Sequence, residues 1–139
     1  MSTELNKAMV RRYLEAYHTG DMDAVMEFLD PNHVLHPGGG EKPMNLGERR
    51  SDELRFFSAF SDIQAIVEDQ IAEGDKVVSR ITMWCTHTGE FHGIPATGKR
   101  IVIPYVDIAL IRAGKILEEW IEFDMMSILR KIGARSHQQ

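Results

Sequence analysis

The chain has 139 residues, of which 43% are hydrophobic and 27% charged, and its formal net charge is −5. This length predicts one domain with a sizeable core, and the acidic balance argues against nucleic acid or a membrane surface as a partner. The first residues do not resemble a signal peptide, and no apolar run approaches the roughly 18 residues of a spanning helix. The single cysteine, Cys85, cannot form an intrachain disulfide, so we expect a cytoplasmic protein.

The first part of the chain predicts a helical hairpin. Apolar residues recur every three or four positions from Leu5 to Tyr17, and Gly20 ends this helix. Asp21 caps a second helix, which ends before Asp30 because the residue preceding a proline avoids the helical region. A short extended segment over 33–36 and a glycine-rich loop then lead to a third helix over 48–60.

The third helix is expected to turn an apolar side inward and a basic side outward. Leu54 and Phe57 are predicted to face the core, whereas Arg49, Arg50 and Arg55 are predicted to face solvent.

Four strands are predicted in the second half of the chain. They cover 63–73, 77–87, a stretch that begins at 101, and 116–123, with glycine-containing turns inside two hairpins. Asp124 caps a last helix, which ends before Gly133. Helices followed by strands indicate an α+β domain over 1–135, in which a curved antiparallel sheet folds around the helical hairpin, with a frayed tail over 136–139.

One strand carries an acid in an apolar row. Its alternate side chains share one face, and they are Ile101, Ile103, Tyr105, Asp107, Ala109 and Ile111. A buried carboxylate is costly unless it is paired or neutralised, and such groups gather where chemistry or ligand recognition needs them. Asp107 is therefore the first candidate for a site, although a fixed structural donor would also explain it.

Three segments of the chain carry a resemblance to known proteins. The nuclear transport factor 2-like superfamily resembles the segment RYLEAYHTGDMDAVMEFLDPNHVLHP, and its SnoaL-type polyketide cyclase subfamily resembles GEFHGIPATGK and AGKILEEWIEFDMMSILRKIG. The resemblance implies a cone of curved sheet closed by three helices around a deep apolar cavity. The cyclase acid of the subfamily is an aspartate in the last strand, and here Ile121 falls at that position. Related epoxide hydrolases also use an aspartate there. Asp124 is better explained as a helix cap.

Ketosteroid isomerase resembles the chain in other places. Tyr13, in RYLEAYHTGDMDAV, falls at the position of its oxyanion-hole tyrosine, and Asp107, in DIALIRAGKI, falls at that of its protonated aspartate. His36, in LDPNHVLHP, falls at the position of its general base. The resemblance implies that Asp107 and Tyr13 hold an oxyanion while His36 moves a proton. Taken alone, Tyr13 is also explained as a core side chain, and His36 as a partner of the loop backbone.

Other residues are expected at the cavity. His87 and Tyr105 are candidates for holding a substrate oxygen, and Glu119 is a second buried-acid candidate. Further lining positions are Ile121, Phe123, Tyr17 and Phe57. We expect no metal site, because His33 and His36 lie on opposite faces of an extended segment, and we expect no cofactor. Cys85 lacks an activating pattern, so a nucleophilic role is not expected.

The sequence supports an acid/base enzyme without a cofactor that isomerises, cyclises or dehydrates a small apolar carbonyl compound. The alternative is a module for ligand binding or dimerisation that keeps the cavity but lacks the cyclase aspartate. Trp84 and Trp120 are expected to face a second copy, because both faces of the sheet look apolar. We therefore expect a homodimer formed through the outer face of the sheet.

Overall fold

The computed structural model of the chain describes residues 2–133, so the predicted tail over 136–139 and the domain end at 135 lie outside the described residues. Helix α1 (Thr3–Thr19) begins at Ser2, whose hydroxyl accepts a hydrogen bond from the Leu5 N–H. It ends at Gly20, where φ is +79°, a backbone conformation that glycine adopts without strain. Helix α2 (Met22–Glu27) is capped by Asp21. The helical hairpin predicted from the sequence is confirmed.

Strand β1 (Leu29–His36) is longer than the predicted extended segment. It pairs with the last strand in parallel, and its register shifts between Leu29 and Val34, around Pro31. Proline has no N–H for a ladder, so an edge strand with an irregular register tolerates it. The loop that follows leads to α3 (Leu46–Ala59), which opens with a capping box of Asn45 and Glu48.

The predicted orientation of α3 is wrong for two residues. Arg49 is fully buried, and Leu54 is 50% exposed. Arg49 and Glu53 are one turn apart, so they share the inward side of the helix. The sequence-based orientation failed because apolar residues occur all around this helix, and buried partners from other elements bind the charge of Arg49.

The remaining strands form the predicted antiparallel meander. They are β2 (Phe60–Glu73), β3 (Lys76–His87), β4 (Arg100–Arg112) and β5 (Lys115–Glu122). The sheet order is β1-β5-β4-β3-β2, so β1 adds a parallel strand beside β5 that the sequence did not predict. Helix α4 (Met125–Lys131) is capped by Asp124, whose carboxylate accepts a hydrogen bond from the Ser127 N–H.

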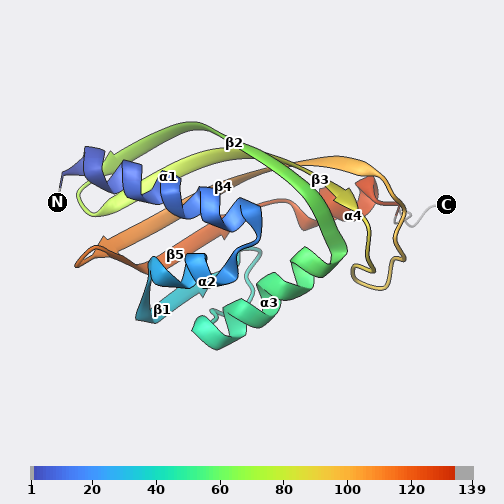
Figure 1. The fold of residues 1–139 in the computed structure, drawn as a ribbon, viewed down its shortest axis with the longest axis horizontal. Helices are drawn as coiled ribbons and strands as arrows, with labels where there is room; N and C mark the ends of the chain where they lie inside the picture. Colours follow the sequence, from blue (N-terminus) through green and yellow to red (C-terminus); the bar gives the residue numbers. More distant parts are fainter. Residues whose placement is uncertain (1, 134–139) are drawn as a thin grey trace.

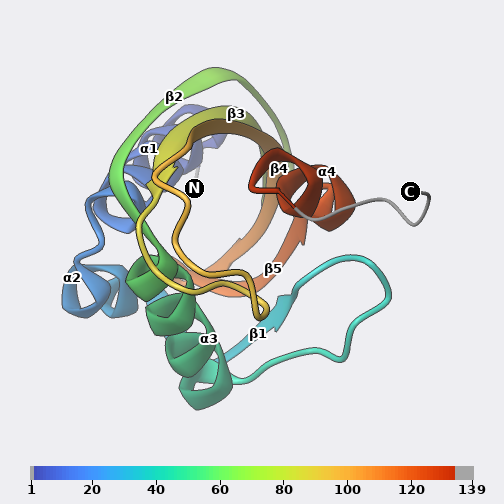
Figure 2. The ribbon, with the colours of Figure 1, turned by 90° about the vertical axis from the view of Figure 1, so that its right-hand side faces the viewer.

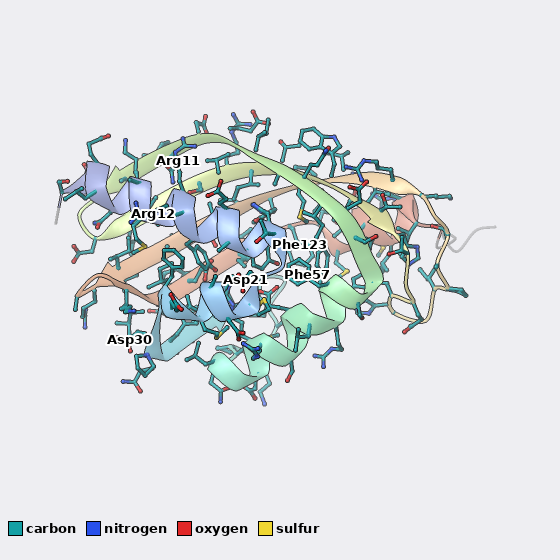
Figure 3. All side chains as sticks on the ribbon, in the orientation of Figure 1. Arg11, Arg12, Asp21, Asp30, Phe57 and Phe123 are labelled. Atoms are coloured by element: carbon teal, nitrogen blue, oxygen red, sulfur yellow. The ribbon has the colours of Figure 1, made fainter. Side chains whose placement is uncertain are left out.

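The sheet is strongly curved, and the helices lie against it on one side. In Figure 1, β2 and β3 arch over α1, and Figure 2 shows the sheet curling from β2 round to β5 with α1, α2 and α3 on the same side. Arg11 and Arg12 lie on the exposed side of α1 (Figure 3), whereas Tyr13 is buried. The expected α+β fold is confirmed. Within residues 2–133, no helix is both long and apolar enough to cross a membrane.

The inner face of β4 is the apolar row that the sequence predicted. Alternate residues from Ile101 to Ile111 are buried, and Asp107 among them has no exposed surface. Register pairs Asp107 with Ile121 and Ala109 with Glu119. Asp107 and Glu119 are therefore diagonal neighbours on the same face of the sheet.

Candidate active site

A cavity of about 530 Å³ opens between α3, α4 and the inner face of the sheet. Its wall includes four residues that the sequence placed there, which are Tyr17, Tyr105, Ile121 and Phe123. Apolar side chains such as Leu35, Met83 and Ile103 form much of the rest, and the buried carboxyl of Glu53 also reaches the wall. A mostly apolar pocket with a few placed polar groups is typical of a small-molecule site.

Glu53 is the functional candidate that sequence reasoning missed. Glu53 is 5% exposed, and its Oε1 accepts a hydrogen bond of 2.7 Å from the Tyr17 hydroxyl. Burial raises the pKa of Glu53 to about 7, although Arg49 and the Tyr17 hydrogen bond act in the opposite direction. A carboxyl group with this pKa exchanges a proton near neutral pH, which suits a general base.

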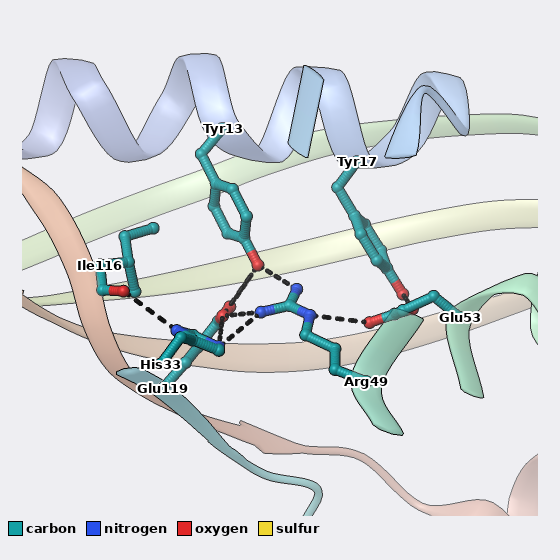
Figure 4. A network of polar contacts seen from close by, with 7 residues as sticks. All are labelled: Tyr13, Tyr17, His33, Arg49, Glu53, Ile116 and Glu119. Atoms are coloured by element: carbon teal, nitrogen blue, oxygen red, sulfur yellow. Dashed lines mark hydrogen bonds and ion pairs between the residues drawn. The ribbon is translucent and has the colours of Figure 1, made fainter. Parts of the chain in front are cut away.

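Arg49 is the centre of a buried polar network beside the cavity (Figure 4). Its Nη1 donates to Glu119 Oε1 at 2.6 Å and to His33 Nε2 at 2.9 Å, and its Nη2 donates to the Tyr13 hydroxyl. Its Nε lies 3.5 Å from Glu53 Oε2. Because arginine only donates, His33 accepts at Nε2 and donates from Nδ1 to the Ile116 carbonyl at 3.0 Å.

Asp107 and Glu119 form a buried acid pair next to this network. Both Asp107 carboxyl oxygens lack a hydrogen-bond donor among the described residues, so no hydrogen bond offsets the cost of burying a negative charge on Asp107. Burial, followed by the charge of Glu119, raises the pKa of Asp107. The neutral form of Asp107 is therefore favoured beside the charged Glu119.

Glu119 keeps its negative charge. Burial alone would raise the pKa of Glu119, but the neighbouring groups, chiefly Arg49 and then Asp107, His33 and Tyr13, outweigh burial and lower it. The Tyr13 hydroxyl lies 2.8 Å from each Glu119 oxygen. Tyr13, Asp107 and Glu119 thus converge, but they lie behind the cavity wall rather than on it.

Two tyrosines, Tyr17 and Tyr105, line the cavity. Burial raises the pKa of Tyr17 and of Tyr105 well above the ordinary value, so both stay protonated at neutral pH. The Tyr105 hydroxyl lies 2.7 Å from His18 Nε2. Burial lowers the pKa of His18 to about 4, so this imidazole is neutral.

His36 does not join Tyr13 and Asp107. Its ring stacks on Trp120, with centroids 5.1 Å apart, and its Nε2 lies 2.6 Å from Glu118 Oε2. Side chains alternate along β1, and Leu35 lines the cavity, so His36 points to the outer face. The expected trio is therefore not assembled, and the inward histidine of this strand is His33.

The other predicted positions lie away from the cavity wall. His87 is buried, and its Nδ1 lies 2.9 Å from Thr97 Oγ1, while Phe57 packs against the Tyr17 ring. Burial raises the pKa of the Cys85 thiol to about 11, which leaves it protonated. Among the described residues no cluster of three or more His, Cys, Asp or Glu side chains has a geometry that holds a metal ion.

Known proteins share sequence with nearly the whole chain. The profile of the SnoaL-like polyketide cyclase family matches residues 7–132. Aklanonic acid methyl ester cyclase DnrD from Streptomyces peucetius is 31% identical over 137 residues, which cover 96% of this chain and 92% of the relative. The cyclase DauD from Streptomyces sp. (strain C5) is 31% identical over 129 residues, or 90% and 80% of the two chains.

Solved structures share the fold. AclR from Streptomyces galilaeus, a candidate hydroxylase, matches with a TM-score of 0.87 at 27% identity over 95% of this chain and 98% of its own. TsrD from Streptomyces laurentii matches with a TM-score of 0.77 at 30% identity over 92% and 97%. The curved sheet with its cavity defines a nuclear transport factor 2-like α+β protein. Within that class, the chain belongs to the SnoaL-like polyketide cyclase family.

Proposed function

We propose that this protein is an acid/base enzyme that closes a carbon ring in a polyketide-like compound by an aldol-type reaction, with Glu53 as the general base. The observation that carries the proposal is the buried Glu53 carboxyl on the cavity wall, whose pKa burial raises to about 7. The names of the curated relatives, which are aklanonic acid methyl ester cyclases, support cyclisation over isomerisation or dehydration.

Glu53 takes the place of the acid that the last strand lacks. Ile121 lines the cavity at the position where the family resemblance implies the cyclase aspartate. Glu53 reaches the same cavity from α3 instead of from β5. The site therefore keeps a base on the wall, although the base comes from a different element.

The reaction is a proton transfer followed by carbon–carbon bond formation. The Glu53 carboxylate removes a proton from a carbon beside a carbonyl, and the electron pair moves to the carbonyl oxygen as an enolate. The enolate carbon then attacks a second carbonyl carbon in the same molecule, and that carbonyl becomes an alkoxide. The alkoxide takes back the proton from Glu53, so no net proton is consumed.

The tyrosine hydroxyls supply the donors that such a reaction needs. In the His18 tautomer that carries its hydrogen on Nε2, the Nε2–H donates a hydrogen bond to the Tyr105 oxygen. The Tyr105 O–H is then free to donate a hydrogen bond to an enolate oxygen. Tyr17 already donates to Glu53 and fixes its carboxyl toward the cavity. The rest of the wall is mostly apolar, which strengthens these interactions, although Asp52, Arg55, Glu90 and His92 also line it.

The test is turnover of aklanonic acid methyl ester, the compound in the relatives' names, followed by chromatography and mass spectrometry. Glu53→Gln should lower the rate by about 100-fold or more, since general-base catalysis typically contributes 10²–10⁴-fold. Glu15→Gln, which removes the same charge from the exposed side of α1, is the matched control and should react at the wild-type rate. Equal rates for Glu53→Gln and the wild type would remove Glu53 from the mechanism.

A binding module remains the second candidate function, and the absence of an acid at Ile121 favours it. In that case the compound binds to both the wild type and Glu53→Gln, and neither protein converts it. Calorimetric titration of the compound into each protein separates binding from turnover.

We also propose a homodimer formed through the outer face of the sheet. That face carries half-buried apolar side chains of β3, β4 and β5, including Trp84, Val106, Ile108 and Trp120. Apolar side chains on a sheet face are typically covered by a partner, and a two-fold interface uses the same patch on both copies. The cytoplasmic location expected from the sequence stays a prediction.

A further inference from the structure

Arg49 lies between two carboxyl groups that reach it from different elements. Glu119 of β5 binds Nη1 at 2.6 Å, whereas Glu53 of α3 is 3.5 Å from Nε. This Nε makes no hydrogen bond among the described residues. The guanidinium is thus engaged with Glu119, Tyr13 and His33, and it is only loosely associated with Glu53 (Figure 4).

We propose that Glu119 is a positioning residue, which holds the Arg49 guanidinium away from Glu53 and thereby keeps the Glu53 carboxylate basic enough to accept a proton from a bound compound. Glu119 touches neither the cavity nor the reacting atoms in this arrangement. Its effect on the reaction passes through Arg49. The catalytic part of this inference rests on the proposed role of Glu53 as the base.

The charges around Glu53 support this competition. The titratable groups that influence it are Arg49 and Asp52 from α3, Tyr17 from α1, and Glu119, Asp107 and Tyr105 from the sheet. Both tyrosines are neutral at neutral pH, and burial raises the pKa of Asp107. Arg49 lowers the pKa of Glu53 more than Glu119 raises it, so Glu119 offsets only part of the attraction that Arg49 exerts on the ionised form of Glu53.

Removal of the Glu119 charge should transfer the attraction of Arg49 to Glu53. An uncompensated cation at this distance favours the ionised carboxylate, so the pKa of Glu53 should fall. A base with a lower pKa removes a proton from carbon less readily, and the acidic limb of the rate profile should move to lower pH. A purely structural role for Glu119 would change stability without this directed change in a neighbouring pKa.

The experiment is a carbon-13 NMR titration of the protein labelled at the glutamate side-chain carboxyl, with Glu53→Gln used to assign the Glu53 signal. The wild-type signal should titrate near the value of about 7. In Glu119→Gln the apparent pKa of Glu53 should fall by about one unit or more, as expected for a carboxyl beside an arginine. An unchanged or higher pKa of Glu53 in this variant overturns the proposal.

Asp107→Asn is the matched control, because it changes the buried carboxyl beside Glu119 but keeps the ion pair between Glu119 and Arg49. The Glu53 pKa should stay at the wild-type value in this variant. If Glu119→Gln does not fold, Glu119→Asp keeps the charge but draws it back from Arg49, and the Glu53 pKa should fall by a smaller amount. No fall in Glu119→Asp would then overturn the proposal.

The two proposals fail in different ways. If the Glu53 pKa falls in Glu119→Gln while Glu53→Gln turns over at the wild-type rate, Glu119 is coupled to Glu53 but Glu53 is not the catalytic base. If Glu53→Gln loses most of its turnover while the Glu53 pKa is the same in Glu119→Gln as in the wild type, Glu53 is the base but Glu119 is not a positioning residue.

Discussion

Replacement of Arg49 by methionine should destabilise the protein strongly. The change leaves Glu119 without the cation that lies 2.6 Å away and removes the donors to His33 and Tyr13. Removal of one partner of a buried ion pair lowers the free energy of unfolding by about 3–5 kcal/mol. For a domain of this size, 1 kcal/mol corresponds to roughly 4 °C, so the midpoint of thermal unfolding should fall by about 12–20 °C.

The loss should depend on pH in a defined direction. In the wild type, the folded-state pKa of Glu119 lies below its ordinary value, with burial opposing this and Arg49 the chief cause of it. The stabilisation from this pair is therefore present above the unfolded pKa of about 4.5 and is lost as the pH falls through the lower folded value. In Arg49→Met, burial instead makes Glu119 bind a proton, so the variant's deficit should shrink as the pH is lowered.

Thermal unfolding followed by circular dichroism at about pH 7.5 and about pH 5 measures both effects. The double variant Arg49→Met/Glu119→Leu is the matched control, since replacing a buried ion pair with apolar side chains is often nearly neutral. It should recover much of the lost stability at the higher pH. The reasoning is refuted if Arg49→Met melts within about 2 °C of the wild type, or if its deficit grows as the pH falls.

Two further predictions concern the cavity and the outer face. Tyr17→Phe removes the hydrogen bond that lowers the pKa of Glu53, so the Glu53 carboxyl should titrate above the wild-type value of about 7 in the same NMR experiment, and a downward change would contradict this. Val106→Glu should convert the proposed dimer to a monomer in sedimentation velocity, whereas Leu54→Glu, on the exposed side of α3, should not. A wild type that sediments as a monomer would dismiss the proposed interface.

The sequence was sufficient for the helical hairpin, the four-stranded meander and the inward side of β4. These features depend on local signals, which are apolar periodicity, capping residues and glycine turns. It also identified Asp107, because a carboxyl in an apolar strand is conspicuous by alternation alone. The convergence of Tyr13, Asp107 and Glu119 required the fold, although each was a candidate beforehand.

The tertiary structure decided which polar residues of α3 and β1 face inward. A glutamate on a helix normally faces solvent, so no local pattern distinguishes Glu53. Arg49 can be buried because Glu119, Tyr13 and His33, from three other elements, accept hydrogen bonds from its guanidinium. The parallel pairing of β1 with β5 turns Leu35 to the cavity and His36 to Trp120. Sequence patterns specify what each segment can bury, but contacts between distant segments determine which charged side chains can be neutralised in the interior.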